Sequence, residues 1–140
     1  KSMISSDARM ISSSCSTTIT VFPKSRSPYK TSIKTTGKST MIVESNITYD
    51  KELKIDDVVD VNLVYFDHDK KRLQYKIEMI HKEKKFLAST IEVLALYVDL
   101  NTRKVSEFEP EKVSIMDNFI KSNKENFDNT NLKFSSRLKK

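Results

Sequence analysis

Four segments of alternating apolar and polar residues, joined by short polar loops, constrain the fold of this chain more than any other feature. They span residues 40–49, 58–66, 73–81 and 86–99. In the clearest of them, Leu73, Tyr75, Ile77 and Met79 alternate with polar side chains. Alternation of this kind predicts β-strands with one buried face. The short loops predict antiparallel neighbours, because a parallel crossover needs about a dozen residues or more.

The alternation also predicts which side chains share a face of the sheet. In the first segment, Met41 and Ile47 are expected on the apolar face and Glu44 and Asn46 on the polar face. In the second segment, Tyr65 is expected on the apolar face with the valines. The fourth segment turns apolar on both faces, which predicts a central strand covered on both sides or a strand at a subunit contact.

Two helices are predicted to accompany the sheet. The first covers residues 110–122, because Pro110 suits a first helical turn and Val113 and Met116 share one face. A sheet with an apolar face needs an element that covers it. We therefore expect a second helix at about residues 7–22, although serine and threonine dominate that segment and have weak helix propensity.

The net charge of +6 is unevenly distributed along the chain. Residues 1–38 carry +6, residues 39–120 carry −4 and residues 121–140 carry +4. A nucleic-acid groove would place basic and aromatic side chains on the folded face. The acidic middle therefore disfavours nucleic acid as a partner.

Length and composition predict one domain with distinct ends. We expect a single domain over residues 1–122, within which residues 1–35 are diverged or incomplete. Residues 123–140 form a polar, basic tail that is expected to be poorly ordered.

The sequence also indicates a compartment and the absence of bound groups. Cys15 is the only cysteine, so no intramolecular disulfide can form, and a reducing cytoplasm is expected. No apolar run approaches the ~20 residues that span a bilayer, and no signal-peptide pattern occurs, so no membrane partner is expected. Zinc-ligand spacing, a phosphate-binding glycine loop and a nucleophile elbow do not occur either, so neither a metal nor a cofactor is expected.

Motifs in the middle of the chain are similar to those of a known family. Ile47-Thr48-Tyr49 precedes Asp56-Asp57-Val58-Val59-Asp60-Val61, and the last strand ends on Val98-Asp99-Leu100-Asn101-Thr102-Arg103. Over about residues 36–120, this order resembles the hot-dog thioesterases of the 4-hydroxybenzoyl-CoA thioesterase type. His68-Asp69-x-x-Arg72-Leu73, combined with the segment 94–100, is most similar to the betainyl-CoA thioesterases of carnitine breakdown.

The resemblance implies a fold, an assembly and a reaction. The fold is α+β, a hot-dog fold in which an antiparallel sheet wraps around one long helix. The assembly is a homodimer or a dimer of dimers. The reaction is hydrolysis of a small acyl-CoA, with the coenzyme A thioester as substrate rather than cofactor.

The family's catalytic element is missing from this sequence. Family members carry Asp-x-x-Gly-His-x-Asn before the long helix, where the carboxylate activates water or attacks the thioester. The only glycine here is Gly37, so Gly-His does not occur. Asp7-Ala8-Arg9 matches the residues just after the element, which places the carboxylate upstream of Lys1 or marks a diverged segment; Asp7 itself is the remaining candidate. Asp56 also departs from the family, which commonly has glycine there.

Other candidate site residues come from the strand faces and turns. Glu44 could be a general base or could hold a cationic acyl group such as trimethylammonium, and Asn46 could orient a carbonyl or a water. Lys70, Lys71 and Arg72 form a basic turn that would attract the three phosphate groups of coenzyme A. The alternative for each is an ordinary solvated strand or loop residue.

Three functions remain open at this point. The first is an acyl-CoA thioesterase, with betainyl-CoA among its candidate substrates. The second is a non-catalytic hot-dog protein that binds an acyl thioester or serves as a dimerisation module, which the missing catalytic element favours. The third is a basic-tailed module for polyanions. His68 is expected in a loop without a base partner, and His81 at a strand end.

Overall fold

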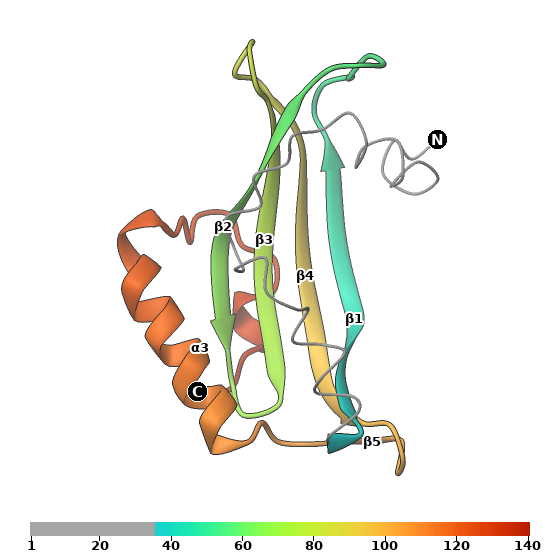
Figure 1. Cartoon of the computed structure of the whole chain (residues 1–140), viewed down its shortest axis with the longest axis vertical. Coiled ribbons are helices and arrows are strands. Elements are labelled where there is room, and N and C mark those ends of the chain that lie inside the picture. The colour runs from blue at the N-terminus through green and yellow to red at the C-terminus, as the bar shows by residue number, and fades with distance from the viewer. Residues whose placement is uncertain (1–35) are drawn as a thin grey trace.

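The computed structural model describes residues 36–140, which form one antiparallel sheet with a helix at its edge (Figure 1). The strands follow the order β1-β4-β3-β2, and β5 pairs with the end of β4. The fold class expected from the sequence is confirmed, whereas the helix expected at residues 7–22 lies outside the described residues. The elements are β1 (Lys38–Tyr49), β2 (Val59–His68), β3 (Arg72–His81), β4 (Leu87–Asp99), β5 (Lys104–Val105), α3 (Pro110–Asn123) and the 3-10 helices η1 (Lys124–Asn126) and η2 (Ser135–Arg137).

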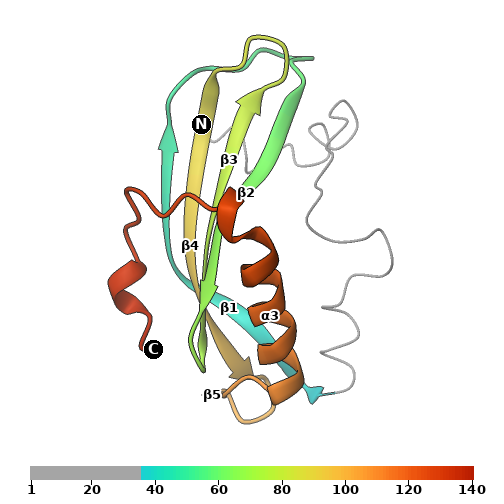
Figure 2. The same cartoon turned by 90° about the vertical axis from the view of Figure 1, so that its left-hand side faces the viewer.

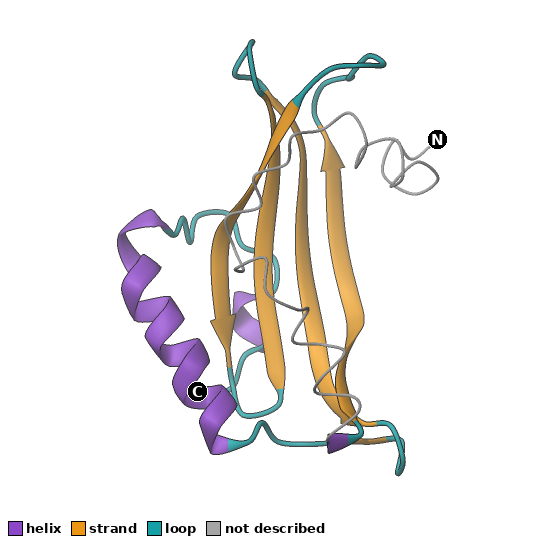
Figure 3. Cartoon of the chain, viewed as in Figure 1, coloured by secondary structure: helices purple, strands orange, loops and turns teal. Residues whose placement is uncertain are grey.

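The alternating segments form the four long strands, within two residues of their expected ends (Figure 3). The strand from Leu87 to Asp99 lies between β1 and β3 and is largely buried, as its two apolar faces predicted. The predicted helix begins at Pro110 and ends at Asn123. Among residues 36–140, no helix is long and apolar enough to cross a membrane.

Two β-bulges change the face on which some side chains lie. In β1 the register shifts between Ile42 and Glu44, so Ile42 rather than Met41 pairs with Ala95 on the apolar face. In β2 the register shifts between Leu63 and Tyr65, and Tyr65 pairs with Lys76 on the polar face. The expectations for Met41 and Tyr65 were therefore wrong, because a bulge inserts one residue that strict alternation does not anticipate.

The core lies where the apolar face of the sheet meets the segment that leads into α3. Leu73 of β3, Ala95 and Tyr97 of β4 and Phe108 form one buried cluster. The rings of Tyr97 and Phe108 stack with centroids 4.4 Å apart. Val113 and Met116, predicted to share a face of α3, both pack against this cluster. The cluster holds α3 beside β2, where the helix and the strand end enclose a groove.

A polar cluster around Glu109 joins three elements at the start of α3. The carboxylate of Glu109 accepts hydrogen bonds from Lys38 at 2.9 Å and from the hydroxyl of Tyr97 at 2.8 Å, and it pairs with Lys112 at 3.0 Å. Burial raises the pKa of this carboxyl, but the hydrogen bonds from Lys38 and Lys112 outweigh it and lower the pKa to about 2. The carboxylate therefore ties the start of β1 to the end of β4 and to the first turn of α3.

Asp56 adopts a backbone conformation that explains its departure from the resembling family. Its φ is +70°, in the left-handed region, where glycine is favoured because it has no Cβ. Aspartate is one of the few other residues that tolerates this region. The turn before β2 therefore keeps a glycine-like conformation with a different residue.

Residues 123–140 were expected to form a poorly ordered tail, but in the structure residues 127–140 pack against the sheet. The chain leaves α3 through η1 and crosses to the polar face, where η2 lies (Figure 2). On this face, Asn46 of β1 pairs with Glu92 of β4, which pairs in turn with Lys76 of β3. Glu92 is therefore covered by the C-terminal segment, whereas Asn46, at the edge strand, stays exposed.

Candidate functional site: a basic groove beside helix α3

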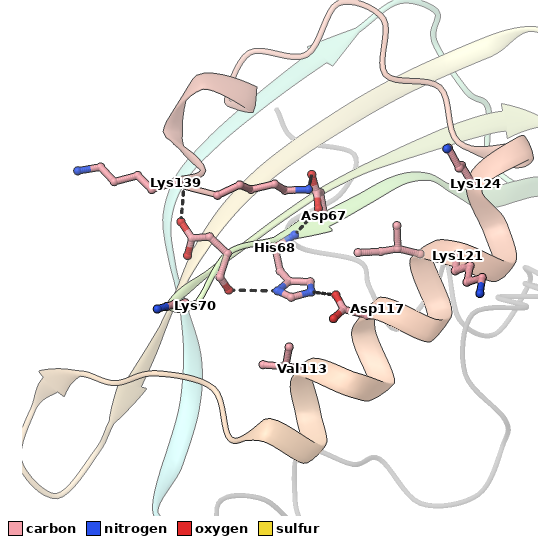
Figure 4. A pocket seen from close by; sticks show the side chains of 11 residues that line it. Asp67, His68, Lys70, Val113, Asp117, Lys121, Lys124 and Lys139 are labelled. Atoms are coloured by element: carbon pink, nitrogen blue, oxygen red, sulfur yellow. Dashed lines mark hydrogen bonds and ion pairs between the residues drawn. The ribbon is translucent and has the colours of Figure 1, made fainter.

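A groove of about 470 Å³ lies where the end of β2, the β2–β3 turn, α3 and the last residues of the chain meet (Figure 4). Its lining combines a few apolar side chains from α3 with many charged ones. The residues are Asp67, His68, Asp69, Lys70, Val113, Asp117, Ile120, Lys121, Lys124, Lys139 and Lys140. Five of these eleven residues are lysines, so the groove is a candidate site for an anionic ligand.

A buried histidine lies between the two walls of the groove (Figure 4). His68, the last residue of β2, is 9% exposed, and its Nε2 lies 2.7 Å from Oδ1 of Asp117 on α3. Its Nδ1 lies 3.1 Å from the backbone oxygen of Asp69. Both partners are acceptors, so the ring donates through each nitrogen when it carries both protons. His68 therefore has a base partner, contrary to expectation, and it fastens α3 to β2 instead of offering a free nitrogen to a substrate.

Each acidic side chain of the groove has a hydrogen-bond or ion-pair partner. Asp67 pairs with Lys140 at 2.7 Å and Asp117 with His68. Asp69 pairs with Arg72 at 2.8 Å. The remaining lysines of the groove form no ion pair with any residue in the described range: Lys70, Lys121, Lys124 and Lys139. Their ammonium groups give the groove an excess of positive charge that a phosphate-bearing ligand could neutralise.

Asp69 organises the turn that forms one end of the groove. Its carboxylate accepts hydrogen bonds from the backbone nitrogens of Lys71, Arg72 and Lys139 and from the guanidinium of Arg72, at 2.8 to 2.9 Å. Burial raises the pKa of Asp69, but these hydrogen bonds outweigh it and hold the pKa below its usual value of 3.8. The carboxylate therefore stays charged, and it fixes both the turn and the end of the chain.

The structure disperses the site residues predicted from sequence. Lys70 lines the groove, whereas Lys71 faces Glu107 at 3.7 Å and Arg72 is bound to Asp69. Glu44 lies on β1, which β4 and β3 separate from β2, and its carboxylate pairs with Arg137 at 3.1 Å.

Of the two other predicted site residues, the structure describes only Asn46, which does not line the groove. Asn46 is exposed on β1, on the same face as Glu44. Asp7 lies outside the described residues. His81 ends β3 as expected, and its Nδ1 accepts hydrogen bonds from the backbone of Glu83 and Lys84. His81 therefore stabilises the turn that follows its strand.

Most residues of the groove were missed by sequence reasoning, because they come together only through long-range contacts. His68 and Asp117 are 49 positions apart. One signal was present: Asp117, Lys121 and Lys124 are spaced four and three residues apart, which places them on one side of a helix. A search for charged side chains at helical spacing would have identified that wall, but not the wall that it faces.

Comparison with known proteins places the chain in a family. The model of the Thioesterase-like superfamily matches residues 14–119. No curated protein sequence matches the chain significantly. The hypothetical protein SAV2348 from Staphylococcus aureus, solved in complex with CoA, is 27% identical, with a TM-score of 0.60 over 79% of this chain and 66% of its own. This chain thus spans just under two thirds of that protein.

More distant structures share the fold. The DHNA-CoA thioesterase from Staphylococcus aureus is 18% identical, with a TM-score of 0.59 over 69% of this chain and 65% of its own. The probable thioesterase YbaW from Escherichia coli is 14% identical, with a TM-score of 0.56 over 66% of this chain and 71% of its own. The family match covers more than half of the sequence, and the antiparallel sheet agrees with it. The chain belongs to the Thioesterase-like superfamily.

Proposed function

We propose that the protein hydrolyses a small acyl-CoA thioester and that the basic groove beside α3 binds the phosphates of coenzyme A. The observation that carries this proposal is the set of ammonium groups around the groove, in a chain of a thioesterase-like family. Coenzyme A bears three phosphate groups, which such a surface attracts electrostatically. The CoA complex of the protein from Staphylococcus aureus supports a ligand of this class.

Glu44 is our candidate for contact with the acyl group or the attacking water. Its side chain is 36% exposed, so it remains accessible beside its partner Arg137. A carboxylate in this position could attract a cationic acyl group. We therefore propose betainyl-CoA as the specific substrate, which would give the protein a role in carnitine breakdown. Asn46, on the same face, would orient the thioester carbonyl or the water.

Glu44→Gln should lower the turnover of betainyl-CoA or acetyl-CoA about tenfold or more, because it removes the charge and keeps the shape. Free-thiol release by the full chain measures this turnover. Arg137→Gln is the matched control, since it breaks the same ion pair but leaves the carboxylate in place. Loss in Glu44→Gln alone supports a chemical role. Equal effects of the two substitutions, or none, would exclude that role.

The alternative function is binding of an acyl thioester without hydrolysis. It is favoured by the absence of the family's Gly-His pair from the sequence, in which Gly37 is the only glycine. Hydrolysis and binding are separated by measuring both on the same preparation. CoA binding without thiol release from any short acyl-CoA would replace the thioesterase assignment with this one.

A homodimer is the assembly we propose, with a dimer of dimers as a further step. In the described part of the chain, β1 is an edge strand, and exposed backbone edges favour association. The large apolar side chains of β1 are also exposed: Met41 49%, Ile42 62%, Val43 48%, Ile47 39% and Tyr49 52%. A second copy that covers them would bury apolar area that a monomer leaves in water.

Sedimentation should therefore give a dimer at micromolar concentration. Ile42→Glu should shift it toward monomer, because the charge would have to be buried at the contact. Ile55→Glu is the control, since Ile55 is 80% exposed and lies outside β1. A monomeric parent protein, or equal dissociation of both variants, would contradict the proposed interface.

A further inference from the structure

The last fourteen residues of the chain form a strap across the polar face of the sheet, which we call the C-terminal strap (residues 127–140). It begins where the ring of Phe127 lies 6.2 Å from that of Tyr65 and 6.0 Å from that of Phe119. The backbone nitrogen of Asp128 then donates to the backbone oxygen of Val64 at 2.8 Å. From there the strap crosses the sheet behind β2 and β3 (Figures 1 and 2).

A buried carboxylate holds the middle of the strap. Glu92, on the central strand β4, is 3% exposed. Its oxygens accept hydrogen bonds from the backbone nitrogens of Lys133, at 2.7 and 2.9 Å, and Phe134, at 2.9 Å, and from Nε2 of Gln74 at 2.8 Å. Burying a charge is costly unless hydrogen bonds compensate it. Two of the three donor groups come from the strap, so Glu92 is well solvated by the protein only when the strap is docked.

The end of the strap reaches the groove. Arg137 pairs with Glu44, and the backbone nitrogen of Lys139 donates to Oδ2 of Asp69 at 2.9 Å. Lys140 pairs with Asp67. These contacts make Lys139 and Lys140 part of the lining of the groove, and Figure 4 shows Lys139 on the side away from α3. Two of the five lysines around the groove are therefore there only because the strap is docked.

We propose that the C-terminal strap, held in place by Glu92, forms part of the phosphate-binding groove. Docking of the strap on the sheet then determines how tightly the groove binds the phosphates of a CoA-type ligand. The identification of that ligand rests on the proposed function. Glu92 acts through the strap, so it is a positioning residue and does not itself touch the ligand. An undocked strap would disperse two positive charges and remove one wall of the groove.

The proposal is tested by CoA and inorganic pyrophosphate binding to the full chain, measured by calorimetry at two salt concentrations. Glu92→Gln removes the negative charge that accepts hydrogen bonds from the backbone nitrogens of the strap. The double variant Lys139→Ala/Lys140→Ala removes the two positive charges that the strap adds to the groove. Each should weaken binding of both probes about fivefold to tenfold, the scale of one or two partly exposed charge contacts. Each should also make the dissociation constant less dependent on salt, because fewer charges take part.

Two further measurements distinguish undocking of the strap from a loss of the overall fold. Trypsin should cleave Glu92→Gln after Lys133 and Arg137 faster than the parent protein, at unchanged cleavage within the sheet. Lys133→Ala is the matched control, because it removes a strap charge that lines no part of the groove and keeps the backbone donor. It should bind both probes within about twofold of the parent, since exposed single charges contribute little.

The outcomes distinguish failure of the strap proposal from failure of the proposed thioesterase function. Parent-like binding in Lys139→Ala/Lys140→Ala, or in a Glu92→Gln protein whose strap trypsin cleaves, would overturn the proposal. Should Glu92→Gln fail to fold, the lysine pair and its control decide the question alone. Strap-dependent pyrophosphate binding without thioester hydrolysis would leave this inference standing while the proposed function fails. Thioester hydrolysis together with binding that does not depend on the strap would support the proposed function and overturn this inference.

Discussion

Replacing Phe108 with alanine should lower the free energy of unfolding by about 3–5 kcal/mol, the usual cost of removing a buried aromatic ring. Phe108 is 8% exposed, stacks on Tyr97 and belongs to the cluster that holds α3 against the sheet. Its ring also lies edge-on to that of His68, with centroids 6.4 Å apart. Urea unfolding of the full chain at one fixed protein concentration measures the loss.

Ile115→Ala on α3 is the control for this substitution. Ile115 is 68% exposed, so its truncation removes little buried area, and the change should stay within about 0.5 kcal/mol. If the two substitutions cost the same, the cluster around Phe108 does not hold the helix. A loss confined to Phe108→Ala would show that the wall of the groove formed by α3 depends on this ring.

Asp69→Ala should destabilise the protein by about 2–4 kcal/mol, because it leaves the guanidinium of Arg72 and three backbone donors without their acceptor. The side chain of Asp69 is 3% exposed, so water replaces these hydrogen bonds poorly. Asp99→Ala is the control. Asp99 accepts two backbone hydrogen bonds in an exposed turn, where the loss should be about 1 kcal/mol or less.

The same substitution should change how stability depends on pH. The pKa of Asp69 is lower in the folded protein than its usual 3.8. The stabilisation is therefore present above about pH 4 and is lost as the pH falls through the folded pKa. As the pH falls below about 4, the free energy of unfolding of Asp69→Ala should fall less steeply than that of the parent protein. Parallel pH curves would contradict the role assigned to this carboxylate.

The sheet could be predicted because its information is local. Alternation fixed the positions of β1 to β4 within two residues, and Pro110 marked the start of α3. The exceptions were the faces of Met41 and Tyr65, because each depends on a β-bulge. Packing between neighbouring strands decides whether a bulge forms and where it shifts the register. The alternation within one strand does not show this.

The candidate site was harder to predict because its contacts join distant parts of the chain. The composition of residues 123–140 is polar and basic, which favoured disorder. The acceptors that hold this segment, Glu92 and Asp69, lie 41 and 70 positions before their donors. The basic turn was recognised from its charges, but Arg72 serves Asp69 rather than the groove. Charge alone did not indicate which cations are already neutralised inside the fold.

The strand order also sets a sequence of events during folding. β2, β3 and β4 form a meander with short loops, whereas β1 pairs with β4 across 40 to 61 positions, from Tyr49 with Ser89 to Lys38 with Asp99. Closing such a loop costs chain entropy before any contact compensates it, so distant pairings form slowly. We expect the meander to nucleate and β1 to join it after the rate-limiting step. Substitutions in β1 should then speed unfolding and leave the refolding rate nearly unchanged in stopped-flow measurements, and slower refolding would refute this order.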